Sequence, residues 1–581
     1  MSVLPIVAAC AGVFILAYLT YGRAVARMLG VDPLRKTPAV EMDDGIDYVP
    51  APAPVVLGGH FTAIAAAGPI VGPILAGQSF GWLPAMLWIV IGAILVGGVH
   101  DAGSLMASIR HGATSITQVV RRYMSRTAYI TFLLFVWVSL LYVIIAFADL
   151  TATSFSRLER VTTMVAGQQT DIELNGGAVV IGATGYLLGS VLLGLLLRFT
   201  KIPWWGGLSA MVVMLALCIW KSPDIAAWLA AHGLPFLDTS TTQAAVLTKR
   251  WDQALLGYCF IASIVPMWLL LQPRGLIGAT FLYAALVFGA VGTLIGGIAG
   301  SENMKVQWPH FVAFTSAGGQ MLFPFLFITI ACGACSGFHS IVSSGTTCKQ
   351  LRNERDVRPV AYGAMLLEGM VAIFALVCVM IGARGSNPDV IYATGMARFM
   401  SMCGIPERFG IGFGLLAFSS FVFDTLDVCT RLGRYVFQEL LGLRGILGGT
   451  VATLATIAGP SAYLWFTPPG SFRTFWTIFG TSNQLLAALT LLGITVWLWR
   501  SGRRVWFTLL PAMFMLATTG TALVFNFRTF LRQYQTLKVP SAAPIINMVV
   551  AVVLFGLAAL VVTEAVRVWK QYRNQPRPVV T

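Results

Sequence analysis

Apolar runs of about twenty residues recur along the whole chain, and this pattern constrains the fold more than any other feature. Of the 581 residues, 57% are hydrophobic and only 10% are charged, and the mean hydropathy is +0.79. A chain of this kind is excluded from the soluble fold classes. The sequence therefore predicts an all-α polytopic membrane protein with about fifteen spans. We expect these spans near residues 2–22, 57–79, 84–109, 127–150, 177–197, 204–220, 252–272, 275–299, 321–345, 360–382, 409–429, 445–466, 473–499, 505–525 and 545–568.

We treat residues 1–581 as a single membrane domain with a core at about 40–490 and additional helices at about 1–22 and 505–568. The external segments 151–176 and 221–251 are polar and we expect them to be irregular. Residues 390–403 are expected to form a short external or re-entrant helix. The net charge of +15 is spread between the spans, which favours membrane orientation and lipid contacts over a nucleic-acid partner. Most of the 38 Lys and Arg residues lie in inside loops if the N-terminus is outside and the C-terminus inside.

The stretch Leu322–Leu351 begins as an apolar span and then becomes small, polar and glycine-rich. On a continuous helix its polar residues would form one stripe, which is costly at membrane depth unless it faces protein or water. We expect such a helix with one wet face, broken near Ser343–Gly345, because half-helices of this kind line substrate sites in transporters. The alternative is a closely packed helix pair with small residues at its seam. The polar stripe comprises Cys332, Ser336, His339, Ser343 and Thr347, and Ser344 and Thr346 are neighbouring site candidates.

Two Gly-Pro pairs interrupt the second span, at Gly68-Pro69 and Gly72-Pro73, shortly after His60. Proline removes backbone donors, so carbonyl groups are freed near the middle of the membrane, where they can hold an ion or a substrate. The alternative is a helix that is merely kinked. We count His60 and both Gly-Pro pairs as candidate substrate-binding residues.

Ionisable residues inside spans are candidates for proton carriage. His100 and Asp101 are adjacent at the end of the third span, and Asp424 and Asp427 lie one turn apart in the eleventh. A hydrogen-bonded packing pair is the alternative for His100 and Asp101, and an ion pair with Arg431 is the alternative for Asp427. Asp424 has no basic residue four positions away and is the stronger proton candidate of the two aspartates.

Three further residues are candidate substrate ligands. Arg274 is the only basic residue of a tight inside turn and could bind a carboxylate, although lipid phosphate or a loop acid is an alternative partner. Asn483 and Gln484 place two amides inside the thirteenth span, where they could contact a peptide backbone or join helices.

Several segments together resemble the carbon starvation protein A family of bacterial inner-membrane transporters. The resemblance is collinear over roughly residues 40–490 and rests on Asp44–Pro50, Gly59–Pro73, Val99–Asp101, Trp268–Arg274, Leu322–Leu351, Thr425–Asp427, Thr430–Arg434 and Asn483–Ala488. It implies membership of the amino acid–polyamine–organocation superfamily, with a LeuT-like core of inverted repeats plus extra helices. It also implies a bacterial inner-membrane location, uptake of peptides during carbon starvation or, in related members, of pyruvate, and coupling to protons. The chain departs from the family pattern at Gly275, where an acidic residue is usual, and at Cys335.

The favoured function is therefore proton-coupled secondary uptake of peptides, with a pyruvate symporter as the alternative. A membrane-embedded metalloenzyme and a nutrient receptor are the alternatives of other classes. Cys332 and Cys335 with the nearby His339 could in principle bind a metal or cluster, but packing is the better explanation in a stripe of small residues. We expect no catalytic residue, no metal and no cofactor, and we expect a small-molecule substrate, protons and membrane lipids as partners.

Overall fold

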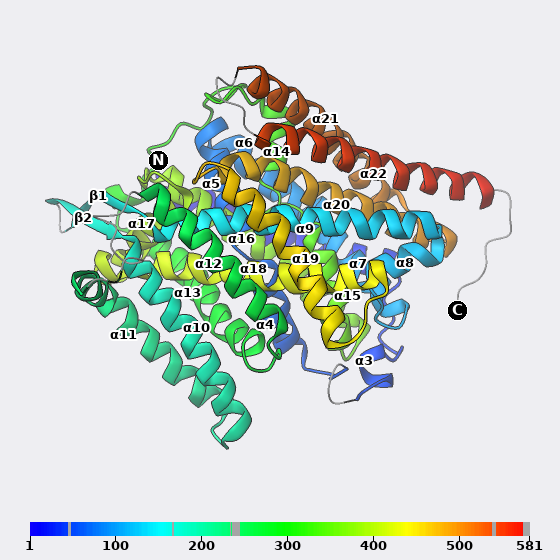
Figure 1. Ribbon diagram of the computed structural model, residues 1–581, viewed down its shortest axis with the longest axis horizontal. Coiled ribbons are helices and arrows are strands. Elements are labelled where there is room, and N and C mark those ends of the chain that lie inside the picture. Colours follow the sequence, from blue (N-terminus) through cyan, green and yellow to red (C-terminus); the bar gives the residue numbers. More distant parts are fainter. Residues whose placement is uncertain (45–47, 166–167, 233, 235–243, 537–541, 573–581) are drawn as a thin grey trace. The chain divides into compact units, whose positions relative to one another are not determined.

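The computed structural model describes residues 1–44, 48–165, 168–232, 234, 244–536 and 542–572, and most of these residues are helical (Figure 1). Gly45, Ile46 and Asp47 of the family-like segment lie outside the described residues. Within the described part, twelve helices are long and apolar enough to cross a membrane, and α4 with α5 forms a further bent pair. The chain is therefore a multi-pass helical membrane protein.

The helices and strands of the first third have the following bounds: α1 (Leu4–Leu19), α2 (Tyr21–Leu29), α3 (Pro38–Glu41), α4 (Ala53–Ile64), α5 (Gly68–Phe80), α6 (Trp82–Gly92), the π-helix η1 (Ala93–Gly97), α7 (Gly98–Arg110), α8 (Ile116–Tyr123), α9 (Arg126–Phe155), β1 (Leu158–Val165), β2 (Gln168–Asn175), α10 (Gly176–Phe199) and α11 (Trp204–Ala231).

The remaining elements are α12 (Ala244–Ile264), α13 (Leu271–Ile298), η2 (Glu302–Met304), α14 (Leu322–Thr329), α15 (Phe338–Gly345), η3 (Thr347–Lys349), η4 (Glu354–Asp356), the π-helix η5 (Arg358–Gly363), α16 (Ala364–Met380), α17 (Pro388–Met402), α18 (Glu407–Leu441), α19 (Gly445–Phe466), α20 (Phe472–Arg500), α21 (Trp506–Thr536) and α22 (Ala542–Tyr572).

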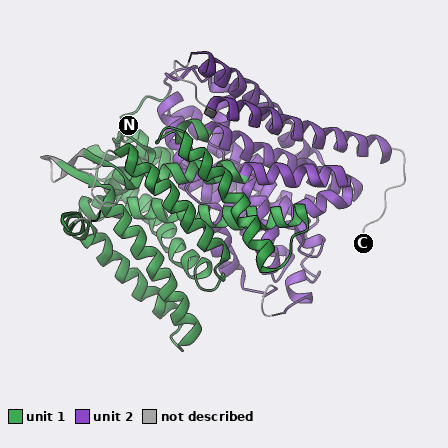
Figure 2. Ribbon diagram, viewed as in Figure 1, with its two compact units in different colours: residues 1–7, 140–310, 374–476 green, residues 8–139, 311–373, 477–581 purple. Residues whose placement is uncertain are grey.

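The chain divides into two compact units that alternate along the sequence (Figure 2). Unit 1 comprises residues 1–7, 140–310 and 374–476, and unit 2 comprises residues 8–139, 311–373 and 477–581. Each unit is thus assembled from segments that are far apart in sequence, so its core depends on tertiary packing rather than on neighbouring hairpins alone.

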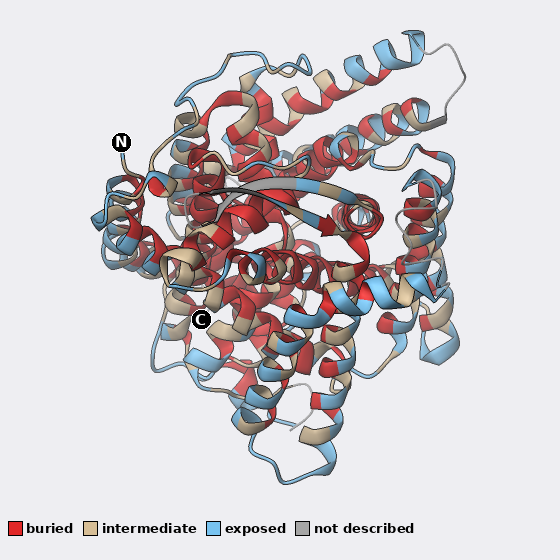
Figure 3. Ribbon diagram, turned by 90° about the vertical axis from the view of Figure 1, so that its left-hand side faces the viewer, coloured by how far each residue is buried: buried red, intermediate tan, exposed pale blue. Residues whose placement is uncertain are grey.

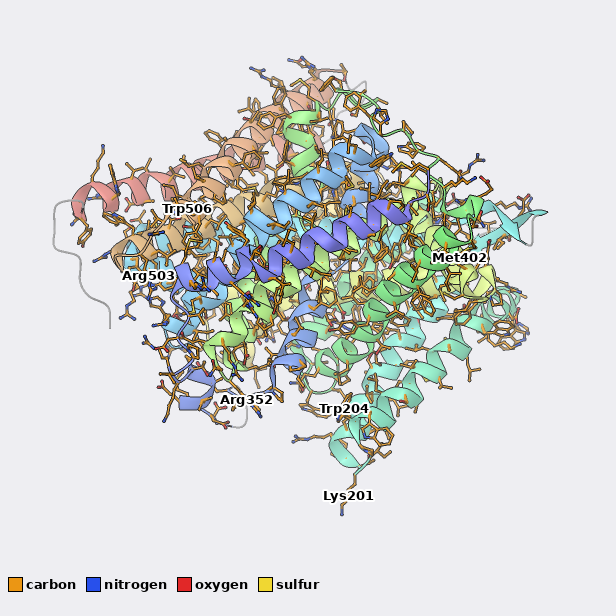
Figure 4. All side chains as sticks on the ribbon, turned by 180° about the vertical axis from the view of Figure 1, so that it is seen from behind. Lys201, Trp204, Arg352, Met402, Arg503 and Trp506 are labelled. Atoms are coloured by element: carbon orange, nitrogen blue, oxygen red, sulfur yellow. The ribbon has the colours of Figure 1, made fainter. Side chains whose placement is uncertain are left out.

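In unit 1, α10 and α11 pack side by side, and α18 packs against α17, α19, α12, α13 and α10 (Figure 1). Lys201 and Trp204 lie at the turn that joins α10 to α11 (Figure 4). Lysine and tryptophan are typical anchors at a membrane interface. α11 exposes most of its apolar window, as expected for a helix that faces lipid.

The external segments are more regular than the sequence predicts. Residues 158–165 and 168–175 form two antiparallel strands in which Leu158 pairs with Asn175, and α11 continues to Ala231. The expected short helix near 390–403 is α17, which begins with Pro388 in its first turn and is buried along most of its length. Residues 166–167, 233 and 235–243 of these segments lie outside the described residues.

In unit 2, α21 and α22 pack side by side, and α14 packs against α5 and α21 (Figure 1). The part of α20 that begins at Thr477 is buried almost throughout, whereas only 28% of the apolar window of α22 is buried. Figure 3 colours the described residues by how far each is buried. Arg503 and Trp506 lie at the turn between α20 and α21 (Figure 4), where the guanidinium of Arg503 rests against Gly30.

Two expected spans are split, and a third is shifted along the chain. The second is split into α4 and α5, which meet at 48°, and the ninth is split into α14 and α15. The seventh lies earlier than expected, because α12 begins at Ala244 and ends at Ile264, two residues before Pro266. A residue that precedes proline disfavours the helical conformation, which explains why this helix stops there.

Candidate functional site

Four ionisable side chains of unit 2 form a continuous buried chain. Asp101 Oδ1 lies 2.7 Å from His100 Nδ1, and Asp101 Oδ2 lies 2.8 Å from His339 Nδ1. The other nitrogen of that imidazole, His339 Nε2, lies 3.2 Å from Glu368 Oε2. All four side chains are fully buried. We call His100, Asp101, His339 and Glu368 the acid–histidine chain.

Three helices bring the acid–histidine chain together. His100 and Asp101 lie in α7, His339 in the first turn of α15 and Glu368 in α16. The approach of α7 depends on glycine, because a Cβ at Gly97 would lie 2.4 Å from the carbonyl oxygen of Ala334. The π-helix η1 precedes α7, and such bulges are frequent at functional sites.

The charges of this chain are balanced only when it carries enough protons. An ionised Asp101 and a protonated His339 neutralise each other, which leaves an ionised Glu368 uncompensated in a buried site. An unpaired buried charge is strongly unfavourable, whereas one further proton on Glu368 or His100 removes it. Within the described part of the chain, neither oxygen of Glu368 has a hydrogen bond of good geometry, and neither does His100 Nε2. The arrangement can therefore hold one exchangeable proton.

His60 lies beside this chain without a hydrogen bond to it. Its Nδ1 is 2.9 Å from Thr347 Oγ1, and it interacts electrostatically with Asp101 and His339. α4 supplies His60, and η3 supplies Thr347. The contact between His60 and Thr347 therefore links α4, the first half of the broken second span, to η3 at the end of the polar stretch.

The two broken spans of unit 2 pack against each other at their breaks. A Cβ at Gly68 would meet Cys332 Sγ at 2.4 Å, and one at Gly72 would meet the carbonyl oxygen of Thr329 at 2.5 Å. Gly333 in turn leaves room for Ala372 and Pro69. The sequence predicts the first break from the Gly-Pro pairs, and the chain leaves the helix just before them, at residues 65–67.

Proline explains the position of this break. Pro69 lies in the first turn of α5, where its missing N–H is not needed. Pro73 lies inside α5 and cannot donate to the carbonyl of Pro69, so that carbonyl is left without its helical partner. Non-helical backbone of this kind is tolerated at membrane depth where it is buried in protein.

The polar stripe is not on one continuous helix, and this prediction was wrong. The helix ends at Thr329 and resumes at Phe338, so Cys332 and Ser336 lie in the break, His339 and Ser343 lie in α15, and Thr347 lies in η3. The helix does end at Gly345, where a break is predicted. Because Gly337 packs against the backbone of Asn483 and Ala487, the small residues at the first break are required for close approach to α20.

The two amides of α20 hold this break in place. Asn483 Oδ1 accepts hydrogen bonds from Phe338 N (3.1 Å) and Ser336 Oγ (3.2 Å). Gln484 Nε2 donates to the carbonyl oxygens of Phe327 (2.5 Å) and Ile330 (3.4 Å). These bonds satisfy backbone groups that a continuous helix would have paired internally.

Three hydroxyl candidates lie in or just after α15. Ser344 Oγ donates to Ser340 O and Thr346 Oγ1 donates to Val342 O, so both are bonded to their own turn of chain. Ser343 Oγ is buried and has no hydrogen bond among the described residues. A buried hydroxyl without a partner is unfavourable, so Ser343 is the hydroxyl most available for a ligand.

The cysteines at the break are not arranged as a metal site. Cys332 Sγ lies 3.5 Å from Asn483 Nδ2, and Cys335 is fully buried. Among the residues that the structure describes, no group of three or more His, Cys, Asp and Glu side chains is placed to hold a metal ion.

Arg274 does not lie in the tight turn that the sequence predicts. It lies in the first turn of α13 in unit 1 and is buried. Its Nε lies 2.5 Å from Asp424 Oδ1, its Nη1 forms an ion pair with Asp427 Oδ2, and Nη1 also donates to Tyr258 Oη at 3.0 Å. Tyr186 Oη is 3.5 Å from Asp424 Oδ1. We call Tyr186, Tyr258, Arg274, Asp424 and Asp427 the Arg274 cluster.

The ion pair between Asp427 and Arg431, which is the alternative to a proton site at Asp427, does not form among the described residues of α18. Arg431 instead donates to the carbonyl oxygens of Ala262 and Val265, both at 2.7 Å. These carbonyls belong to the last turn of α12 and the residue after it, where a cation is favoured by the helix dipole. The i,i+4 spacing on α18 is therefore overridden by tertiary partners for both residues.

The candidate residues thus form two separate groups. Unit 2 holds His60, the Gly68–Pro73 break, the acid–histidine chain, the polar residues after Cys332 and the two amides, whereas unit 1 holds Arg274, Asp424 and Asp427. Sequence reasoning missed Glu368, Tyr186 and Tyr258. Glu368 could have been found, because it is the only charged residue between positions 360 and 382 and an acid in an apolar span is a functional candidate.

Known proteins resemble this chain over most of its length. A sequence model of the family described as "Carbon starvation protein CstA" matches residues 2–390 and 382–522. The chain is 31% identical to "Peptide transporter CstA" of Helicobacter pylori (strain J99 / ATCC 700824), over 89% of this chain and 81% of that protein. It is 31% identical to "Pyruvate/proton symporter BtsT" of Escherichia coli (strain K12), over 90% and 81%.

A relative of similar length is "Peptide transporter CstA" of Bacillus subtilis (strain 168), which is 30% identical over 99% of this chain and 98% of its own. Among solved structures, a crystal structure of a mutant of the Eremococcus coleocola manganese transporter is similar with a TM-score of 0.44 at 13% identity, covering 91% of this chain and 99% of that one. The family model and the relatives together cover nearly the whole chain, and the chain belongs to the carbon starvation protein CstA family.

Proposed function

We propose that this protein is a secondary transporter that takes up peptides together with protons. The observation that carries the proposal is the acid–histidine chain, in which one imidazole joins two buried carboxylates beside two broken membrane helices. Broken helices at membrane depth form binding sites for small molecules and ions in transporters. Relatives in the same family are named as transporters of peptides or of pyruvate with protons.

The coupling proton is held by the acid–histidine chain. Asp101 fixes His339 through Nδ1, and Glu368 faces Nε2, so a proton gained or lost by Glu368 changes the charge balance around His339. His100 contacts Asp101 Oδ1, the carboxylate oxygen that does not contact His339. His339 lies in the first turn of α15, directly after the segment between α14 and α15. A change of charge around His339 therefore alters the electrostatic forces on that segment.

The substrate site is formed by the two breaks of unit 2. The candidates are His60, the Gly-Pro pairs Gly68-Pro69 and Gly72-Pro73, and the polar residues Ser336, His339, Ser343, Ser344, Thr346 and Thr347. The freed carbonyl of Pro69 suits an ammonium group, and the unpartnered hydroxyl of Ser343 suits a carboxylate or an amide. Asn483 and Gln484 act by holding the break between α14 and α15 through hydrogen bonds. Arg274 as a substrate ligand stays a prediction, and in the structure its guanidinium contacts two carboxylates.

The proposed membrane topology has fifteen spans. It adds the bent pair α4–α5, the split pair α14–α15 and α12 to the twelve long helices. An odd number of spans places the termini on opposite sides, and the distribution of Lys and Arg then favours a periplasmic N-terminus and a cytoplasmic C-terminus in a bacterial inner membrane. The LeuT-like arrangement of inverted repeats, with anionic lipids around the basic loops, belongs to the same proposal.

A proton-coupled pyruvate symporter is the second candidate, favoured by the relative from Escherichia coli. The two functions are distinguished by uptake into proteoliposomes with an imposed inward proton gradient, using a labelled dipeptide and labelled pyruvate side by side. Dipeptide accumulation that collapses with a protonophore supports the proposal. Accumulation of pyruvate alone supports the second candidate, and uptake that ignores the proton gradient contradicts both.

A further inference from the structure

The Arg274 cluster of unit 1 is a second buried group of ionisable side chains. Four helices contribute to it, since Tyr186 comes from α10, Tyr258 from α12, Arg274 from α13, and Asp424 and Asp427 from α18. The side chains of Arg274 and Asp427 are 1% and 0% exposed, and that of Asp424 is 10% exposed. Helices can pack stably through apolar side chains alone, so three buried charged side chains are not needed for packing.

The cluster contains one more acid than base. Arg274 supplies one positive charge, and two ionised aspartates would supply two negative charges. Arg431 and Arg434 form no ion pair with either aspartate among the described residues, and they donate instead to carbonyl oxygens of Ala262, Val265 and Ser263 at the end of α12. A buried net charge of this kind is costly, so the cluster must gain a positive charge in at least one of its states.

Apart from Arg431, which interacts electrostatically with Arg274, no other charged group faces the cluster among the described residues. Tyr186, Tyr258 and Arg274 are the ionisable partners that face the two aspartates from α10, α12 and α13, and Cys259 lies next to Tyr258. Among the described residues of α11, α17 and α19, which also pack in unit 1, none interacts electrostatically with Asp424. Both tyrosines can donate a hydrogen bond to the aspartates and remain neutral.

A proton satisfies this cluster better than a metal ion does. A cation such as Na⁺ or Ca²⁺ needs several oxygen ligands around it, but the guanidinium of Arg274 already occupies the space between the carboxylates. A second cation next to that guanidinium would also be repelled. A proton needs only one oxygen lone pair.

Asp424 is the better acceptor of that proton. Asp427 Oδ2 accepts from Tyr258 Oη at 2.6 Å and also pairs with Arg274, so its charged form is well supported. Each aspartate has one buried oxygen without a hydrogen bond among the described residues, Asp424 Oδ2 and Asp427 Oδ1. The other oxygen of Asp424 has Arg274 and only a distant hydroxyl, Tyr186, so its charged form is supported less well than that of Asp427. Asp424 is also the one of the two with some exposure.

We infer that Asp424 is a second exchangeable proton site, distinct from the acid–histidine chain, and that the transporter carries two protons with each substrate. The inference rests on the proposed proton-coupled uptake. On uptake, a hydronium ion loses one O–H bond to become water as Asp424 Oδ2 gains one, and on release the Asp424 O–H bond breaks and the proton returns to a water molecule, while Arg274 stays charged and paired with Asp427.

The first test does not depend on transport. The full-length protein in lipid is compared at low and high pH by infrared difference spectroscopy, which detects the carbonyl stretch of a protonated carboxylic acid. We expect the wild type to show a band that is lost in Asp424→Asn and shifted in Asp424→Glu, while Glu368→Gln removes a different band. A wild-type spectrum that is unchanged by both substitutions at position 424 overturns the inference, even if uptake is proton-coupled.

The second test measures stoichiometry. Proteoliposomes are loaded with labelled dipeptide and, in parallel, with labelled pyruvate, and the membrane potential that stops net flux at a fixed pH gradient is determined for the probe that is transported. We expect two protons for each substrate in the wild type and one in Asp424→Asn. A wild-type ratio of one, or an unchanged ratio in Asp424→Asn, overturns the inference without touching the proposed function. If Asp424→Asn does not fold, Asp424→Glu is used, and we expect it to keep the ratio of two.

Discussion

Glu368 Oε2 in α16 lies 3.2 Å from Nε2 of His339 in α15, and both side chains are fully buried. The same imidazole reaches Asp101 through Nδ1, so its two nitrogens face two carboxylates. One imidazole can donate to both acids only when it is protonated. Whether Glu368 is protonated therefore decides whether the group around His339 is neutral or negative. A proton-coupled transporter needs a buried group that changes its charge in this way.

The first prediction concerns Glu368→Gln. Glutamine has the shape of a protonated glutamate but cannot release a proton, so the site is held in its neutral form. We expect proton-driven accumulation of labelled dipeptide to fall by about tenfold or more, equivalent to about 1.4 kcal/mol of lost coupling. Exchange of internal for external substrate should continue, because it needs no net proton movement.

Glu368→Asp is the matched control for this variant, since it keeps a titratable carboxyl on a shorter side chain. We expect it to keep part of the accumulation. Equal accumulation by Glu368→Gln and the wild type would remove Glu368 from the coupling mechanism.

The second prediction concerns the stability contributed by Asp101, whose two carboxylate oxygens form hydrogen bonds with His100 and His339. Asp101→Asn leaves two buried imidazoles without their anionic partner, and removing one member of a buried pair costs roughly 3–5 kcal/mol. We expect a clear fall in the thermal midpoint of the purified protein in detergent. Ser104→Ala is the control, because Ser104 Oγ donates only to the carbonyl of His100 and its loss costs about 1 kcal/mol. Similar midpoints for the two variants would show that Asp101 is not held as an ion.

The third prediction uses two glycines at the ends of one helix. A Cβ at Gly337 would lie 2.5 Å from the backbone of Asn483 and Ala487, whereas a Cβ at Gly345 meets nothing within 4 Å. We expect Gly337→Ala to abolish uptake or folding, because backbone atoms of α20 must move. Gly345→Ala should keep wild-type uptake and yield, and the reverse order of severity would contradict the packing of the break.

The fourth prediction separates two buried asparagines of unit 2. Asn483 accepts from Phe338 N at the start of α15, whereas Asn526 Nδ2 donates to Thr481 Oγ1 at 3.2 Å, a bond between α21 and α20 that holds no backbone group of the break. Asn483→Ala leaves a backbone donor unpaired, which costs about 1–3 kcal/mol, and it loosens the segment that carries His339. We expect uptake of labelled dipeptide to fall much more in Asn483→Ala than in Asn526→Ala at similar protein yield. Equal losses would show that Asn483 serves general helix packing.

Local chemistry explains what could be predicted from the sequence. The apolar runs predict where helices lie, because a membrane span needs its own length of apolar residues. The break before Gly68-Pro69 follows from proline geometry within a few residues of chain. The pairing of His100 with Asp101 could be predicted because the residues are adjacent in one span.

Tertiary packing explains what could not. Asp427 has a basic residue one turn away on its own helix, yet it pairs with Arg274 of α13, because burial places that guanidinium between the two aspartates. The break at residues 330–337 interrupts a polar stripe that is helical by spacing, because Asn483 and Gln484 of α20 supply the hydrogen bonds that the helix gives up. Neither partner is visible from local periodicity.

The most direct test of the central claim is the proton flux that accompanies substrate entry. Reconstituted protein with a pH indicator sealed inside the vesicles is given external dipeptide, and pyruvate in parallel, with no imposed proton gradient. The proposed mechanism predicts that the wild type acidifies the vesicle interior as labelled substrate enters, and that Glu368→Gln gives no acidification, although it still exchanges substrate in vesicles that are preloaded with it. Substrate entry into wild-type vesicles without acidification, or equal acidification by Glu368→Gln, would contradict it.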